Sequence, residues 1–302
     1  MKFNKEGHMT FSKPAGLRTA TLLLSLGLYF SQTSCTSAKK EDWLRPEPQE
    51  PKPQRVVDVT ESKDKTAQQE KGHHYADLMN LWSYQGVTGP ESWGRIRPEF
   101  KLCGEGREQS PINLVWSQPQ PGGPHLAQSY QDGPLKLVDL GHNLQVSLEP
   151  GSQASLHGQS YALKHIDFHL PSEHKLSGQQ WPLEIHLHHE GPEGQKAIVA
   201  ILGQLGQEHA GLTKILAHPP QQRYREVVAP VNFSAAELLP HRDTHYKYRG
   251  SLTTPPCSEG VLWIVLNTPI EFSEEQQTAF QALFRPNNRP LQPLNQRRVR
   301  NF

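Results

Sequence analysis

Short apolar runs with alternating polar positions dominate the chain from about residue 73 onward. Alternation with a period of two is typical of β-strands with one buried face, and Gly and Pro separate the runs. The pattern predicts strands at residues 135–140, 144–148, 161–170, 183–189, 197–205 and 261–267. It predicts helices at residues 210–218, 234–239 and 273–284, the last with Ser273 as N-cap. We therefore expect one mainly β domain over residues 73–302, with short peripheral helices.

Residues 1–72 have a different pattern. Basic residues precede an apolar run at 19–30, which is too short to span a bilayer, and small residues lead to Cys35. This is the pattern of an export signal, so residues 1–34 are expected to be a signal peptide. Residues 32–35 resemble a bacterial lipobox, in which Cys35 becomes the lipidated first residue; ordinary cleavage and secretion is the alternative. Residues 35–72 are rich in Pro, Glu and Lys and predict a disordered tether.

Cysteine usage and charge agree with an exported protein. If Cys35 of the three cysteines carries lipid, Cys103 and Cys257 remain, and an oxidising compartment allows them to form a disulfide around a loop of about 150 residues. Two buried free thiols are the alternative. The balance of 31 Lys+Arg against 30 Asp+Glu argues against broad nucleic-acid binding. We expect a periplasmic or outer-membrane-anchored lipoprotein rather than a freely secreted protein, with membrane contact through the lipid only.

Histidines are concentrated in two of the expected strands. Six of the 16 lie close together: His165, His169, His174, His186, His188 and His189. Alternate residues of a strand share a face, which groups His165, Asp167 and His169 in one run and Glu184, His186 and His188 in the other. Asp167, His169 and His186 can then form the three-ligand open site of a catalytic zinc, with Glu173 and Glu184 orienting rings or a bound water. The alternatives are half-exposed histidines without a ligand role, or the similar Asp-x-His-x3-Glu metal motif of cupin barrels.

Seven motifs between residues 82 and 299 resemble, in order, those of the α-class carbonic anhydrases. They are WSYQGVTGPESWG (82–94), GREQSPINL (106–114), GHNLQV (141–146), HIDFHLPSEH (165–174), LEIHLHH (183–189), GSLTTPPCSEGVLWIVL (250–266) and QPLNQRRV (292–299). The resemblance sets the cupin alternative aside. It implies a large, twisted, mostly antiparallel central sheet in a single domain and a disulfide between Cys103 and Cys257. It also implies a zinc cofactor and the reversible hydration of CO2 to bicarbonate and a proton.

The resemblance implies a role for each candidate site residue. Asp167, His169 and His186 take the positions of the zinc ligands; zinc lowers the pKa of bound water to about 7 and so supplies hydroxide. The Thr253 hydroxyl accepts a hydrogen bond from the nucleophile because it donates its only proton to Glu173. The remaining positions are Glu184 as acceptor from His186, His142 as proton shuttle with an ordinary pKa near 6.5, Thr254 as substrate contact, and Ile201, Leu252, Val261 and Trp263 as the apolar wall for CO2.

Asp167 departs from the family pattern, which has His at the first ligand position. One outcome is that Asp167 binds zinc as a carboxylate, which makes bound water less acidic. A second is that His165 or His188, on the same faces, replaces the missing imidazole, although His188 can also crowd the CO2 pocket. A third is a non-catalytic, carbonic-anhydrase-related binding module without zinc. The catalytic set is otherwise complete, so we expect a zinc enzyme of altered, reduced activity; the sequence leaves the oligomeric state open.

Overall fold

The computed structural model describes residues 81–120, 126–156, 158–242 and 244–302. The expected signal peptide, the lipidation at Cys35, the whole expected tether and residues 73–80 of the expected domain therefore lie outside the described residues. No described helix is long and apolar enough to cross a membrane.

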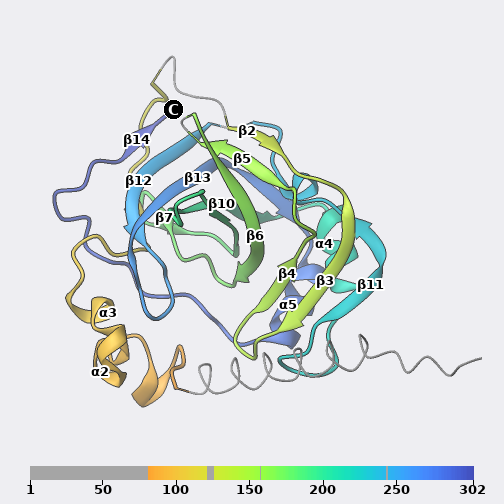
Figure 1. The fold of residues 1–302 in the computed structure, drawn as a ribbon, viewed down its shortest axis with the longest axis horizontal. Helices are drawn as coiled ribbons and strands as arrows, with labels where there is room; N and C mark the ends of the chain where they lie inside the picture. Colours follow the sequence, from red (N-terminus) through yellow and green to blue (C-terminus); the bar gives the residue numbers. More distant parts are fainter. Residues whose placement is uncertain (1–80, 121–125, 157, 243) are drawn as a thin grey trace, which may run out of the picture. The chain divides into compact units, whose positions relative to one another are not determined.

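A large mixed sheet forms the centre of the described chain (Figure 1). Its eleven strands are β2 (Ala127–Ser129), β3 (Gly133–Asp139), β4 (Leu144–Ser147), β5 (Gln153–Leu156), β6 (Gln159–His169), β9 (Leu183–Glu190), β10 (Lys196–Leu205), β11 (Val227–Phe233), β12 (His245–Ser251), β13 (Glu259–Phe272) and β14 (Arg300–Asn301). The main path runs β11-β3-β4-β6-β9-β10-β13-β12-β14, while β5 pairs with β2 and with β6. Among the described residues, β10–β13 is the one parallel strand pairing of this sheet, so the sheet is mostly antiparallel as expected. The large sheet and the short helices confirm the expected mainly β fold.

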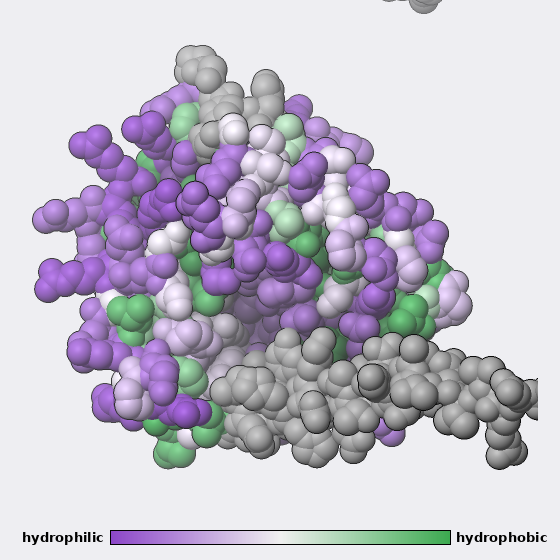
Figure 2. All heavy atoms as spheres, in the orientation of Figure 1, coloured by the Kyte–Doolittle hydropathy of each residue, from purple (hydrophilic) through white to green (hydrophobic). Residues whose placement is uncertain are grey.

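A second, small sheet and several short helices surround the large sheet. The small sheet contains β1 (Asn113–Leu114), β7 (Lys175–Leu176) and β8 (Gln179–Gln180). The α-helices are α2 (Trp93–Ile96), α3 (Leu102–Glu105), α4 (Ala210–Leu216) and α5 (Glu274–Leu283), and the 3-10 helices are η1 (Gly86–Thr88), η2 (Pro98–Phe100) and η3 (Ala235–Leu238). Ser273 caps α5 as expected, since its hydroxyl accepts from the backbone N–H of Gln276. On the face shown in Figure 2, hydrophilic side chains predominate.

The two faces of the large sheet carry separate apolar clusters, because side chains alternate along each strand. On one face, odd-numbered residues of β10 such as Val199 and Ile201 are buried together with α4, η3 and α5. On the other face, Ile198 and Ala200 of β10 are buried with Trp263 of β13. This second face also carries the histidine-rich positions of β6 and β9.

Cys103 of α3 and Cys257, between β12 and β13, form a disulfide with an S–S distance of 2.08 Å and Cα atoms 5.0 Å apart. Both are buried in a third cluster with Trp82, Trp93 and Phe100. The bond joins the N-terminal helices to the loop that carries Thr253 and Thr254.

Candidate metal centre

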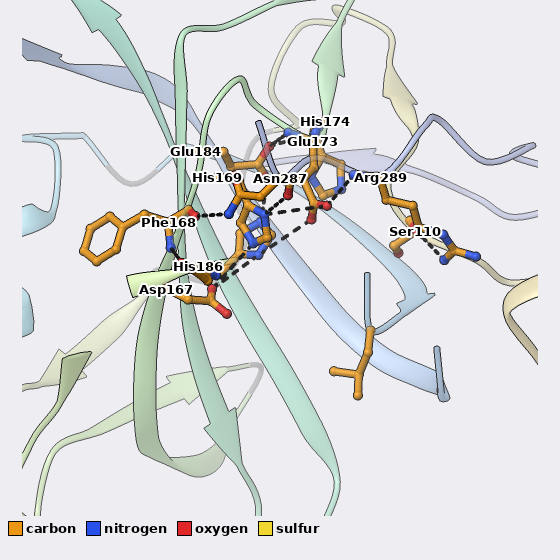
Figure 3. Close-up of polar contacts among 12 residues, drawn as sticks. Ser110, Asp167, Phe168, His169, Glu173, His174, Glu184, His186, Asn287 and Arg289 are labelled. Carbon is orange, nitrogen blue, oxygen red and sulfur yellow. Dashed lines mark hydrogen bonds and ion pairs between the residues drawn. The ribbon is translucent and has the colours of Figure 1, made fainter. Parts of the chain in front are cut away.

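The candidate ligands are brought together by the pairing of β6 with β9. Asp167 lies directly opposite His186 and His169 directly opposite Glu184 in this antiparallel pair. Residues directly opposite each other share a face, so the two strands place their polar side chains on the second face of the sheet. Figure 3 shows Asp167, His169 and His186 converging there, with Glu173 beside them.

Three atoms of these residues form a donor set of the size a zinc ion requires. Asp167 Oδ1 lies 3.7 Å from His169 Nε2 and 3.8 Å from His186 Nδ1. Zinc–ligand bonds of about 2.0–2.2 Å in a tetrahedral site separate neighbouring donors by about 3.3–3.6 Å. Both imidazole nitrogens are buried and have no hydrogen-bond partner among the described residues. Buried nitrogens are normally hydrogen-bonded, so this pair of free lone pairs beside a carboxylate fits a metal ion.

The opposite nitrogen of each ring holds the ring in place. His169 Nδ1 donates to the backbone carbonyl oxygen of Asn287 at 2.9 Å, and His186 Nε2 donates to Glu184 Oε1 at 2.8 Å. Because a carbonyl or carboxylate oxygen only accepts, these bonds fix the tautomers that leave His169 Nε2 and His186 Nδ1 as lone pairs. Glu184 thus accepts from His186 as expected, whereas Asn287 was not among the expected site residues.

Glu184 is also the centre of a buried hydrogen-bond network. His174 Nδ1 donates to Glu184 Oε1 at 2.6 Å, and the backbone N–H groups of Glu173 and His174 donate to Glu184 Oε2. His174 Nε2 in turn bonds the Tyr248 hydroxyl, which bonds the Ser110 hydroxyl. His174 belongs to the histidine-rich part of the sequence but had no expected role, and Tyr248 was not among the expected site residues. The network fixes the rotamer of Glu184 and, through it, the ring of His186.

Glu173 sits beside the donor set with one oxygen anchored and one oxygen free. Its Oε1 accepts from the backbone N–H of Arg289 at 2.9 Å. Its Oε2 is buried without a hydrogen-bond partner among the described residues. The expected hydrogen bond from Thr253 to this oxygen is therefore not formed in this conformation, although Thr253 is buried and the acceptor is available.

The carboxylates make the site attractive to a cation. Burial by itself would raise the pKa of Asp167, but His188 and His169 outweigh it and hold that pKa well below its ordinary value. Burial would likewise lower the pKa of His169, but Glu173 and Asp167 raise it to about 10. The pKa of His186 is lowered by burial and by His169. In the metal-free site His169 Nε2 therefore carries an additional proton in place of the lone pair of the neutral ring, and a metal ion must displace this proton.

A cavity of about 400 Å³ opens beside Asp167. Leu252 and Thr254, two of the expected substrate contacts, line it together with His142, His165 and His188. Of the wall that the resemblance assigns to CO2, Leu252 lines this cavity, and polar side chains lie beside it.

The expected role of Ile201 in that wall is wrong, because the residue lies on the opposite face of β10. Ile201 is fully buried in the main core with α4 and α5. Ile198 is three residues away on the strand, so it points to the opposite face and lines the cavity. Val261 and Trp263 are buried with Ile198 on the face that carries the histidines, and neither is among the residues that line the cavity. The Trp263 ring packs edge-on against His186, with centroids 5.0 Å apart, and so supports a ligand.

His142 lies at the cavity as expected, but its environment differs from the expected one. Its ring packs against Trp82 with centroids 4.6 Å apart, and its Nδ1 donates to the carbonyl oxygen of Leu140 at 3.1 Å. Burial lowers the pKa of His142 to about 4, instead of the ordinary value near 6.5. Its free Nε2 is therefore a weak base for a proton shuttle.

Comparison with known proteins identifies the family. Residues 88–302 match the family described as eukaryotic-type carbonic anhydrase. The chain is 40% identical to a carbonic anhydrase of Nostoc over 72% of this chain and 84% of that protein, and 37% identical to one of Pectobacterium carotovorum over 72% and 88%. An α-carbonic anhydrase structure from Thermovibrio ammonificans, solved with the inhibitor sulfanilamide, is 35% identical with a TM-score of 0.70, covering 72% of this chain and 98% of that one. The chain therefore belongs to the α-carbonic anhydrase family.

Proposed function

We propose that the protein catalyses the reversible hydration of CO2 with zinc held by Asp167, His169 and His186. The two buried, unpartnered imidazole nitrogens beside the Asp167 carboxylate carry this proposal. Zinc, when bound, supplies a Lewis acid that makes hydroxide available near neutral pH. CO2 hydration needs this chemistry, and CO2 hydration is the activity of the family.

The surrounding residues hold and orient the reactants. Asn287 and Glu184 keep the two imidazole lone pairs aimed at one point. Glu173 Oε2 has no hydrogen-bond partner among the described residues and is the acceptor for the Thr253 hydroxyl proton, which leaves the Thr253 oxygen to accept from the attacking water. Leu252 and Thr254 border the space next to Asp167 in which CO2 can approach.

Asp167 lowers the activity at neutral pH. A carboxylate brings a full negative charge where the family has a neutral imidazole, and negative charge next to an ionising water raises its pKa. Less hydroxide is then present at pH 7, and the pH midpoint of hydration lies above 7.

Transfer of the proton from the attacking water out of the site is a second step that is slow in this protein. A proton that leaves a group with a pKa of about 7 or higher must go uphill by at least about 3 pKa units, or ~4 kcal/mol, to reach His142, whose pKa is about 4. Soluble buffer bases that enter the cavity offer an easier acceptor.

We also propose that the protein is exported and anchored through lipid on Cys35. The signal-like residues 1–34 support export, and so does the Cys103–Cys257 disulfide, a bond that persists in oxidising compartments.

The test is stopped-flow CO2 hydration by the chelator-stripped chain before and after zinc is added. Zinc is expected to restore hydration in the wild type and in His241→Ala, a control at an exposed histidine, but not in His186→Ala. Sulfanilamide should inhibit the restored activity, as expected for a relative of the Thermovibrio enzyme.

A non-catalytic binding module is the alternative, and Asp167 at the first ligand position is the observation that favours it. Zinc-loaded wild type without hydration at any pH from 6 to 10 would establish that alternative.

A further inference from the structure

A second group of metal-ligating side chains adjoins the first. His165, Asp167 and His188 present one ligand atom each within 4.8 Å of one another, as do Asp167, His169 and His186. Asp167 belongs to both groups, so its carboxylate lies between them. The first group is used by the proposed function, and His165 and His188 have no part in it.

The pairing of β6 with β9 explains why the two groups are neighbours. His165 lies opposite His188. This pair is two residues along each strand from the Asp167–His186 pair and therefore lies on the same face of the sheet. The His165 and His188 rings are stacked, with centroids 4.2 Å apart and planes 16° from parallel. His188 Nε2 lies 3.2 Å from Asp167 Oδ1.

Metal ions in solution can reach this outer group. His165, Asp167 and His188 are each only partly buried, and all three line the cavity of about 400 Å³. The nearby cations Lys164 and Lys196 are both within ion-pair distance of Glu190, at 3.5 and 3.6 Å, which offsets part of their repulsion toward a metal ion. The inner group, by contrast, has its two imidazoles fully buried.

The donor types define which ion fits. Two imidazoles with one carboxylate suit zinc and the neighbouring divalent transition metals rather than calcium or magnesium. In this conformation Asp167 Oδ1 is the oxygen near the inner imidazoles and near His188 alike. A carboxylate has two oxygens and about four lone-pair directions, so rotation of the Asp167 carboxylate lets it serve both cations. Carboxylate-bridged pairs with metals about 3.5–4 Å apart are an established arrangement in hydrolytic enzymes.

We propose that His165, Asp167 and His188 form a second divalent transition-metal site, which shares the Asp167 carboxylate with the inner site. This site accounts for the aspartate that lies between four imidazoles. A carboxylate at position 167 can bind two metal ions at once, whereas a histidine there would offer only one free nitrogen. The second ion binds more weakly than the first, since two like charges approach each other and the outer donors are more exposed.

The proposal is tested by the number of zinc ions that the full-length chain binds after its metal has been removed with a chelator. Equilibrium dialysis against zinc, followed by elemental analysis, gives this number. The wild type is expected to bind two zinc ions, and His165→Ala and His188→Ala one each. His241→Ala, the exposed control, should keep two. Circular dichroism and thermal melts establish that each variant is folded.

His186→Ala separates this proposal from the proposed function. A single wild-type zinc that survives in His165→Ala and His188→Ala overturns the second site and leaves the inner one standing. A single zinc that is lost in His165→Ala but kept in His186→Ala supports the outer site and contradicts the inner one. If the wild type binds a single zinc, and both His188→Ala and His186→Ala weaken its affinity, the protein has one four-ligand site. This outcome also overturns the proposal.

Copper gives a readout that needs no variant. With two equivalents of Cu²⁺, the wild type is expected to show the spin coupling of a close pair in its electron paramagnetic resonance spectrum. Two uncoupled Cu²⁺ signals would contradict a shared Asp167.

Discussion

Replacing Asp167 with His restores the donor type that the α-carbonic anhydrases have at this position. Asp167 is 18% exposed and borders the cavity of about 400 Å³, so a larger ring has space beside it. The substitution removes one negative charge from a site whose donor atoms are 3.7–3.8 Å apart. The pH midpoint of CO2 hydration should respond, because it reports the ionisation of the attacking water.

The size of the shift follows from that separation. Two unit charges about 4 Å apart interact by about 4 kcal/mol at an effective dielectric constant of 20, which equals about 3 pKa units. Partial exposure of Asp167 reduces this figure, so we expect the midpoint of Asp167→His to fall by about 1–3 pH units relative to the wild type. At a pH below the midpoint, lowering the midpoint by one pH unit increases the hydration rate by up to tenfold. Hydration at pH 7 should therefore rise by about tenfold or more.

Stopped-flow hydration across pH 6–10, on zinc-loaded protein of measured metal content, is the assay. Gln145→His is the matched control, because Gln145 pairs with Asp167 across β4 and β6 and lines the same cavity. It adds an imidazole without removing the carboxylate and should leave the midpoint in place. If zinc-loaded Asp167→His kept the wild-type midpoint and a rate no higher than wild type, Asp167 would not occupy the first ligand position.

Three further outcomes are expected. Burial lowers the pKa of His142 to about 4, so added imidazole buffer should accelerate wild-type hydration, and His142→Ala should cost less than about threefold even at low buffer concentration; a large loss at low buffer would contradict a weak shuttle. The pKa of His169 is raised to about 10, so below pH 10 the ring holds a proton that must leave when zinc binds. Zinc affinity should therefore rise about tenfold per pH unit toward pH 10, and calorimetry in several buffers at pH 8 should show about one proton released per zinc bound at the inner site. No proton release would show that His169 is already neutral. Cys103→Ser with Cys257→Ser should lower the free energy of unfolding by about 2–5 kcal/mol in guanidinium titrations, since the bond closes a loop of 154 residues; an unchanged midpoint would refute this.

The alternation of polar and apolar residues was sufficient to predict most of the central strands. All six expected strands are present, and the helices at 210–218, 234–239 and 273–284 appear as α4, η3 and α5. β12 was missed because its sequence, HYKYRGS, mixes bulky polar and aromatic residues. Its packing between β13 and β14, rather than its own pattern, makes it a strand.

The candidate site was predictable where it depends on alternation within a strand. The phase of β6 and β9 placed Asp167, His169 and His186 correctly, because paired strands keep their faces. Ile201 was assigned to the wrong face, since an almost continuously apolar strand such as β10 has no alternation to reveal which side faces the site. The contact from Asn287 to His169 spans 118 residues of sequence, and only the folded chain reveals it.

The central claim is that Asp167, His169 and His186 hold the zinc. Anomalous scattering at the zinc edge from crystals of the zinc-loaded protein tests it most directly. We predict a peak about 2.0–2.2 Å from Asp167 Oδ1, His169 Nε2 and His186 Nδ1. Loaded crystals without a peak within bonding distance of these three atoms would contradict the account.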